Sequence, residues 1–343
     1  MRYNTAAQRV GIAKGAILAH AIHKEVLGIT GDTQPMQKNM GTTLKMRRWL
    51  PYGGSATNAT TINTISVTVE DHLAEDGSTP DADDLIPQDI TVEMRQYACL
   101  YSYTDWMADM YEDDIPGPMR EQVGERMGLL REMIRYGAMK QCSNRFYAGG
   151  TSQATVADRV TLGFMRAMSR SLQANRGSMI SEFLEASANY NTAPIEASYL
   201  TFGHTDMEAD FRDLEDFVPT SKYARRRMVH ECELGSVERF RVVLSPELAP
   251  ILAGGAAIGS TGLKSVGAAN VDIYPTLVVG RNAWGDIALR GMTSFKITHI
   301  KPEQIDSSDP LGQRGYVGAK FPSAAKVLND GWMALGYAGV TDL

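Results

Sequence analysis

The longest helical pattern in the chain is a stripe of apolar side chains in its first half. The members recur at steps of four, three, four and four residues: Val123, Met127, Leu130, Ile134 and Ala138. Pro116 and Pro118 suit the first turn of such a helix, where no amide hydrogen is needed, and Gly149 and Gly150 suit its end. The pattern predicts one helix over 118–148, ~45 Å long at ~1.5 Å per residue.

Two short segments alternate apolar and polar residues with the period of a strand. Leu44 and Met46 share one face of 43–49, and 90–97 repeats the alternation. We expect these segments to pair as the two legs of a hairpin. About 40 residues separate them, which is far more than a turn requires and indicates a loop with a function of its own.

The remaining elements mix short helices and strands. The pattern predicts helices over 12–26 and 161–175, a strand over 199–202, and a helix through Phe211 and Leu214 that begins at a capping box formed by Thr205 and Glu208. Further strands are expected at 239–244, 273–279, 287–289 and 295–300, with a flexible Gly/Ala/Ser-rich connector over 253–270 and a packed apolar tail over 315–340. Strict βαβ alternation is missing, so the fold class is α+β.

Charges on the long predicted helix are separated by sign. At about 100° per residue the arginines fall within roughly 80° of one another, and the glutamates occupy another flank. The two sets are Arg120, Arg131, Arg135 and Arg145, and Glu121, Glu125 and Glu132. A helix that stabilises itself would alternate opposite charges at i,i+4, so these flanks are arranged for partners outside the helix, or form a solvated surface with segregated charge.

The long loop of the predicted hairpin is strongly acidic. No Lys or Arg occurs from Trp49 to Met94, and carboxylates crowd its second half, including Asp81, Asp83 and Asp84. The spacing of a calcium-binding EF-hand is absent. Two alternatives remain, a solvated acidic loop and a loop that docks on the basic surface of a neighbouring subunit. The helix arginines are the candidate receiver, with Arg131 and Arg135 first.

The densest basic cluster lies in the second half of the chain. It consists of Lys222, Arg225, Arg226 and Arg227. Such a cluster contacts nucleic acid, pairs with charges of another subunit, or is a solvated loop.

Composition limits the classes of protein that the chain can be. Of 343 residues 43% are hydrophobic and 22% charged, as in soluble globular proteins. The net charge is −6, which argues against a protein that condenses nucleic acid. No apolar run reaches the ~20 residues of a membrane span, and no signal peptide opens the chain, so we expect no membrane partner. Cys99, Cys142 and Cys232 lack metal spacing and indicate a reducing compartment.

Motifs of catalysis fail on spacing. A glycine-rich stretch before Lys264 and Ser265 has Leu263 between the last glycine and the lysine, so it does not form a phosphate-binding loop. His20 and His23 lack the glutamate and third ligand of a zinc helix, and no serine lies in GxSxG. We therefore expect no enzyme activity, no cofactor and no metal.

Several segments, taken in order, resemble the major capsid proteins of tailed bacteriophages, specifically the N4-like group with the HK97-like fold. They are ILAHAIHKEVLG from Ile17, PMQKNMGTTLKMRRWLPY from Pro35, IRYGAMKQCSNRFYAGG from Ile134, PIEASYLTFGHTDMEADFRDLEDFVPTSKY from Pro194, GSVERFRVVLSPEL from Gly235, YPTLVVGRNAWGDIALRG from Tyr274, and DPLGQRGYVGAKF from Asp309 with VLNDGWMA behind it. The set spans nearly the whole chain and is weakest over 53–89.

The resemblance implies a division of the chain. It implies an N-terminal arm over 1–42 that lies along a neighbouring subunit, an extended loop (E-loop) over 43–97, a peripheral domain over 98–157 and 293–343 with the spine helix 118–148, and an axial domain over 158–292. An unsupported arm, an overlong acidic loop and a helix with segregated charge are then all surfaces that wait for other copies of the chain.

The implied function is assembly. Identical subunits would form pentamers and hexamers that close into an icosahedral shell around double-stranded DNA, which the inner face would contact non-specifically. Implied partners are a portal protein and scaffolding or decoration proteins, and the implied location is the virion, with assembly in the host cytoplasm. An encapsulin-like compartment shell protein of the same fold is the alternative.

Overall fold

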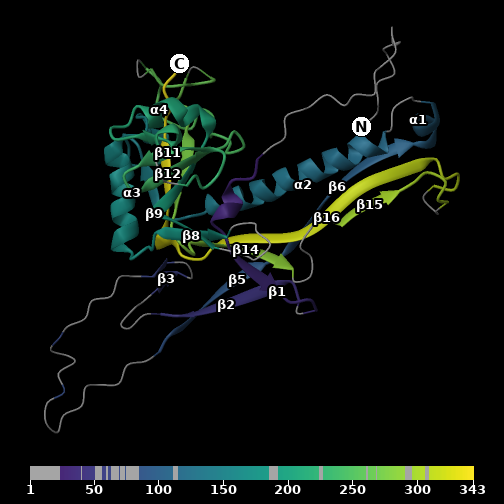
Figure 1. The fold of residues 1–343 in the computed structure, drawn as a ribbon, viewed down its shortest axis with the longest axis horizontal. Coiled ribbons are helices and arrows are strands. Elements are labelled where there is room, and N and C mark those ends of the chain that lie inside the picture. The colour runs from purple at the N-terminus through teal and green to yellow at the C-terminus, as the bar shows by residue number, and fades with distance from the viewer. Residues whose placement is uncertain are drawn as a thin grey trace.

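The computed structural model (Figure 1) describes residues 24–39, 41–50, 56–58, 61–62, 69, 74, 85–110, 115–184, 192–223, 227–259, 262–267, 269–289, 296–305 and 309–343. Its helices are α1 (Asp105–Met110), α2 (Pro116–Met139), α3 (Leu162–Ala174) and α4 (Glu208–Arg212), with short 3₁₀ turns that include η1 (Leu27–Ile29), η4 (Thr205–Met207) and η6 (Asp330–Trp332).

An elongated body is formed by α2 and a five-stranded sheet (Figure 1). The strands are β1 (Asp32–Met36), β14 (Trp284–Leu289), β16 (Arg314–Val327) and β15 (Lys296–Ile300) in that order, with β6 (Arg95–Thr104) along the other edge of β16. Alternate residues of β6 and β16 face the helix, so that Cys99, Tyr103 and Val317 are buried against Val123 and Met127. The apolar stripe of the sequence is this contact.

A second, more globular body surrounds an eight-stranded sheet. The strand order is β10 (Val218–Pro219), β11 (Glu233–Val237), β12 (Phe240–Leu244), β9 (Thr192–Gly203), β13 (Tyr274–Val279), β17 (Met333–Ala338) and β7 (Arg145–Tyr147), and β8 (Ile180–Leu184) pairs with β9. On one face α3 packs Met165, Met168 and Leu172, while Thr161 caps the helix by accepting a hydrogen bond from the Phe164 amide.

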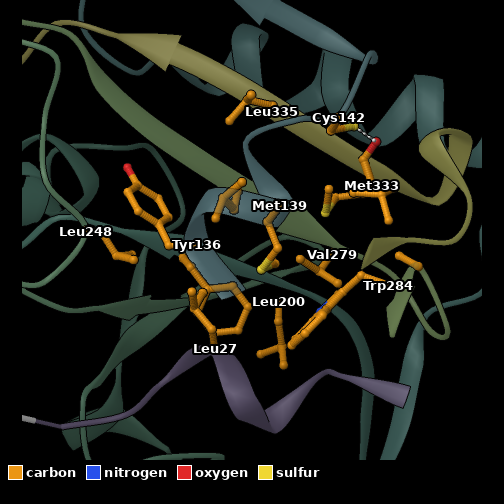
Figure 2. Close-up of a cluster of buried hydrophobic side chains, with 14 of the residues drawn as sticks. Leu27, Tyr136, Met139, Cys142, Leu200, Leu248, Val279, Trp284, Met333 and Leu335 are labelled. Carbon is orange, nitrogen blue, oxygen red and sulfur yellow. Dashed lines mark hydrogen bonds between the residues drawn. The ribbon is translucent and has the colours of Figure 1, made fainter. Parts of the chain in front are cut away.

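One buried cluster lies where the two bodies meet (Figure 2). Tyr136 and Met139 come from the end of α2, Trp284 from the start of β14, Leu200 from β9 and Leu27 from η1. All but Tyr136 are fully inaccessible to solvent, and Tyr136 is nearly so. The junction is therefore a true core made by segments that are far apart in sequence.

The predicted hairpin is confirmed. β2 (Thr43–Trp49) pairs in antiparallel register with β5 (Pro87–Glu93), which starts three residues earlier than predicted and ends at Glu93. Met94 separates β5 from β6, so the predicted strand over 90–97 is divided between the two. Ile90 and Val92 turn inward against Ile287 of the five-stranded sheet. A small pair, β3 (Ala56–Asn58) with β4 (Thr61–Ile62), lies within the segment between the legs. The acidic residues Asp81, Asp83 and Asp84 of this segment lie outside the described residues.

The predicted helix 118–148 is wrong at its C-terminal end, because α2 stops at Met139. The following residues find partners outside the helix: the Ser143 amide donates to Asp330 and the Asn144 side chain donates to the Met333 carbonyl. The Ser143 amide thus has an acceptor outside the helix, and the Asn144 side chain attaches the following residues to β17. Arg145 consequently lies on strand β7, beside β17, rather than on the helix.

The described part of the predicted N-terminal arm lies on its own chain. Val26 and Leu27 are fully buried in the junction core, and β1 pairs in parallel with β14. Pro35 is tolerated because β1 is an edge strand. The helix predicted over 12–26 lies mostly outside the described residues, and 24–26 are not helical.

Three smaller expectations are also corrected. At 204–208 the cap is His204, whose Nδ1 accepts from the Asp206 amide, so the predicted capping box of Thr205 does not form. The predicted flexible connector over 253–270 is pinned where it is described, because buried Asp272 accepts from the amides of Ala253 and Val266. Finally, β14 belongs to the sheet of α2, whereas β7 and β17 belong to the eight-stranded sheet, which differs from the predicted division at these three strands.

Candidate assembly interface

Arg131 and Arg135, the first predicted receivers of a neighbour's acidic loop, form ion pairs within their own chain. Arg131 holds Glu25 at 2.7 Å, and Arg135 binds Glu25 at 3.0 Å and Asp286 at 2.6 Å. The Arg135 side chain is only 8% exposed. Its guanidinium therefore joins the segment before η1 to α2 and to β14, and is not presented to solvent.

Glu132 was placed on the acidic flank of the helix, but it is buried. Its Oε1 accepts hydrogen bonds from the amides of Val26 at 2.9 Å and Leu27 at 2.8 Å, and its Oε2 lies 3.6 Å from Arg135 Nη1. A buried carboxylate is stable only with such donors and a nearby cation. Glu132 thus has a structural role inside the chain.

Arg120 lies near the start of α2 and is exposed. It donates to Nδ1 of His299 on β15 at 2.7 Å, and Nε2 of the same ring shares a hydrogen bond with the Tyr103 hydroxyl at 2.8 Å. Because the guanidinium only donates, Nδ1 must carry no proton. This contact ties the helix to both edges of the sheet, and Arg120 keeps surface that another subunit can reach.

Arg145 is exposed on β7, where its Nε donates to the Cys142 carbonyl at 3.0 Å. It does not share a surface with the other helix arginines by helical periodicity, since the helix has already ended. The four predicted arginines are therefore divided into an internal pair, Arg131 and Arg135, and two surface residues, Arg120 and Arg145.

The basic cluster lies on a loop with a buried ionic support. Lys222 and Arg227 are exposed, whereas Arg225 and Arg226 lie outside the described residues. Buried Glu233 accepts from the hydroxyl of Tyr223, which directly follows Lys222, and from the amide of Val229, two residues after Arg227. Arg241, 3.8 Å from Glu233, donates to the Arg227 carbonyl at 2.8 Å. The described residues at both ends of the cluster are thus attached to the globular body, and Lys222 and Arg227 are exposed.

Sequence reasoning missed the acidic partners of this region. Glu25 and Asp286 lie 106 and 151 residues from their arginines, so no local spacing reveals them. The available signal was the like-charged pair that Arg131 and Arg135 form at i,i+4. Glu132 on the same helix lies 3.6 Å from Arg135, and the other carboxylates come from distant parts of the chain.

Within the described ranges no three His, Cys, Asp or Glu side chains gather closely enough to hold a metal ion. None of the helices that the structure describes is long and apolar enough to cross a membrane.

Known proteins share this architecture over its full length. The chain superposes on the capsid of Ralstonia phage GP4 with a TM-score of 0.63 and 13% identity, covering 99% of this chain and 98% of that one. For the cyanophage P-SCSP1u capsid the TM-score is 0.59 and the identity 13%, covering 96% of this chain and 92% of that one. For the cyanophage Pam1 capsid the TM-score is 0.58 and the identity 15%, covering 100% of this chain and 99% of that one. The fold is that of phage capsid proteins, so the predicted α+β HK97-like class is confirmed.

In sequence, the chain is 20% identical over 262 residues to the major capsid protein of Pseudomonas phage KPP21, a match that covers 71% of this chain and 66% of that protein. No known family model matches the chain. In sequence and in fold the chain is thus similar to phage major capsid proteins, as the resemblance implied, and the similarity favours this class over an encapsulin-like shell protein. The narrower N4-like grouping stays a prediction.

Proposed function

We propose that this chain is the structural subunit of a phage head, without enzyme activity, and that copies of it form pentamers and hexamers that close into an icosahedral shell. The observation that carries the proposal is the end-to-end likeness to capsid subunits, 99% of this chain against 98% of the Ralstonia phage GP4 chain. A partial likeness would leave room for a domain with another function; this one accounts for the whole described architecture.

Exposed apolar side chains support association. At one end of the elongated body, the Asp105 amide donates to the Gln313 carbonyl and so joins α1 to the loop after β15. Trp106 on α1 is 68% exposed, and Leu311 on the loop is 75% exposed. At the legs of the hairpin, Trp49 and Leu85 are also exposed. Large apolar groups that gather at the extremities of a subunit are typical of surfaces that another chain covers.

We also propose that the acidic loop of one subunit docks on basic residues of another. Arg131 and Arg135 already neutralise Glu25 and Asp286, so reversing their charge would break the subunit itself. The basic cluster, in which Lys222 and Arg227 are exposed, is the better receiver, with Arg120 and Arg145 as further surface cations. Asp81, Asp83 and Asp84 are the proposed donors of negative charge.

Charge reversal tests this docking. Lys222→Glu with Arg227→Glu should weaken assembly, and Asp83→Lys with Asp84→Lys should partly restore it, because opposite charges would again face each other. Arg176→Glu, an exposed arginine on the turn after α3, is the matched control. Assembly of the first variant at the wild-type concentration would contradict docking on this cluster and leave shell formation itself intact.

Further partners follow from the proposed function. Double-stranded DNA would meet the inner face non-specifically, and a net charge of −6 would keep it from adhering. A portal protein, and scaffolding or decoration proteins, would complete the particle in the host cytoplasm before it becomes a virion.

Sedimentation velocity of the purified chain over a range of concentration and salt tests the proposed function. Species far larger than one 37.5 kDa chain should form as concentration rises. A single slow boundary at every concentration and salt would overturn self-assembly.

A further inference from the structure

The segment over 24–30, here called the arm root, crosses the junction between the two bodies. Val26 and Leu27 are fully buried there among Met139 of α2, Leu200 of β9 and Trp284 of β14 (Figure 2). Beyond the arm root the chain continues into β1, which adds an edge strand to the five-stranded sheet. The arm root is therefore packed against both sheets and against the helix end at the same time.

Polar contacts attach the arm root to each of these elements. Glu132 of α2 accepts hydrogen bonds from the amides of Val26 and Leu27. Glu25 is held by Arg131 and by Arg135, and Arg135 also holds Asp286 of β14. These contacts connect three parts of the chain through the guanidinium of Arg135, whose side chain is only 8% exposed, so that solvent screens its charge less than at the surface.

The N-terminal and C-terminal sides of the arm root are fixed as well. Lys24 pairs with Glu231 of the globular body at 3.0 Å. At the other side, the indole N–H of Trp284 donates to Thr30 Oγ1 at 3.0 Å. A Cβ at Gly28 would stand 2.7 Å from Arg135 Nη1, and one at Gly31 would stand 2.8 Å from the Trp284 ring. The backbone of the segment is thus fitted closely to its neighbours.

The covalent connections between the two sheets are few and short. One linker, 280–283, joins β13 to β14, a second, 328–332, joins β16 to β17, and 140–144 joins α2 to β7. Two hydrogen bonds join the first two linkers to each other. The Leu328 amide donates to the Ala283 carbonyl and the Gly280 amide donates to the Trp332 carbonyl, both at 2.9 Å. Such short connections allow a hinge unless packing prevents it.

We propose that the arm root is a strap that locks this hinge: its contacts with Glu132, Arg135 and Trp284 fix the position of one sheet relative to the other. The proposal concerns the single subunit and does not depend on the proposed assembly.

Amide hydrogen exchange of the purified full chain, resolved by mass spectrometry, tests the strap with Glu132→Ala. The variant removes the acceptor of the Val26 and Leu27 amides, so their exchange should rise about tenfold or more. The amides of Gly280 and Leu328, which report on the hinge, should also exchange faster. Amides of α3 and of the β6–β16 ladder near Val317 should keep their wild-type rates.

Two variants separate the causes. Glu132→Gln keeps an acceptor oxygen and removes the charge, so it should affect Val26 and Leu27 less than the alanine variant. Glu121→Ala removes an exposed carboxylate from the same helix and should change none of these amides. If Glu132→Ala does not fold, Thr30→Val replaces it. This variant removes the acceptor of the Trp284 indole N–H, and its effect is measured as the exchange rates of the same amides.

Two results would overturn the proposal. Faster exchange confined to Val26 and Leu27, with Gly280 and Leu328 unchanged, would mean that the segment is attached to the hinge without holding it. Equal acceleration of all amides, α3 and the distal sheet included, would mean that Glu132 supports global stability only.

Discussion

At the scale of single residues, two histidines use the same local geometry. Nδ1 of His204 accepts from the Asp206 amide at 3.0 Å, and Nδ1 of His230 accepts from the Cys232 amide at 3.1 Å. Burial lowers the pKa of both rings, more than the nearby carboxylates raise it. Each ring is therefore neutral in the folded chain, and each accepts a bond that protonation would remove.

These histidines predict a loss of stability in mild acid. Because their pKa values are lower in the folded than in the unfolded chain, the unfolded chain binds more protons as pH falls below 6.5. The free energy of unfolding should therefore decrease between pH 7 and pH 5 (about the range in which histidine titrates). Denaturant titration measures it, and His204→Asn with His230→Asn should flatten the slope, since Asn accepts the same amides without titrating. A free energy of unfolding that stays constant over this pH range in the wild type would contradict the lowered pKa values of the two histidines.

The cysteines predict a graded reactivity. Burial raises the pKa of Cys142 to about 12, and its thiol is fully inaccessible at the junction. Burial also raises the pKa of Cys232, but this side chain is partly exposed. Alkylation of the native chain followed by peptide mass spectrometry should therefore modify Cys232 before Cys142, because the thiolate is the reactive form. Modification of Cys142 before unfolding would show that the junction opens.

At the scale of elements, the sequence predicts the helix ends that depend on neighbouring residues and misses the one that depends on distant residues. The start of α2 at Pro116 and the cap of α3 at Thr161 were predictable, since each depends on the residues within one turn. The end of α2 was not, because Asp330 and Met333, nearly 190 residues further on, bind the backbone and side chains that follow it.

The candidate site divides in the same way. The charge segregation of α2 correctly indicated partners outside the helix, but only the fold shows that Glu25 and Asp286 of the same chain are those partners. The exposed cluster containing Lys222 and Arg227 was found from its composition, whereas its support by Glu233 and Arg241 depends on the pairing of β11 with β12.

Two glycine substitutions should change stability in opposite directions. A Cβ at Gly137 on α2 meets no atom within 4 Å, so Gly137→Ala should stabilise the subunit by ~0.5–1 kcal/mol through helix propensity. At Gly336 on β17 a Cβ would lie 2.8 Å from the Phe164 ring, so Gly336→Ala should destabilise it by ~1–3 kcal/mol. Denaturant unfolding compares them, and a Gly336→Ala variant as stable as the wild type or more stable would contradict the packing of α3 on β17.

At the scale of the whole molecule, the subunit combines a stable junction with extremities that carry exposed apolar and charged groups. Trp49 and Leu85 lie on the hairpin, Trp106 and Leu311 lie at the far end of the elongated body, and the basic loop lies on the globular body. Contacts between unlike surfaces are heterologous, and such contacts close into rings when the rotation between subunits allows it. The proposed strap would set the shape that each subunit brings to the ring.

The most direct test of this account is electron microscopy of the fastest-sedimenting fraction of the purified chain, with averaging of the particles by symmetry. We predict closed shells, or rings with fivefold and sixfold symmetry, in which one hairpin reaches the adjacent subunit. Filaments, amorphous aggregates or closed dimers in that fraction would contradict the assignment of the chain as a capsid subunit.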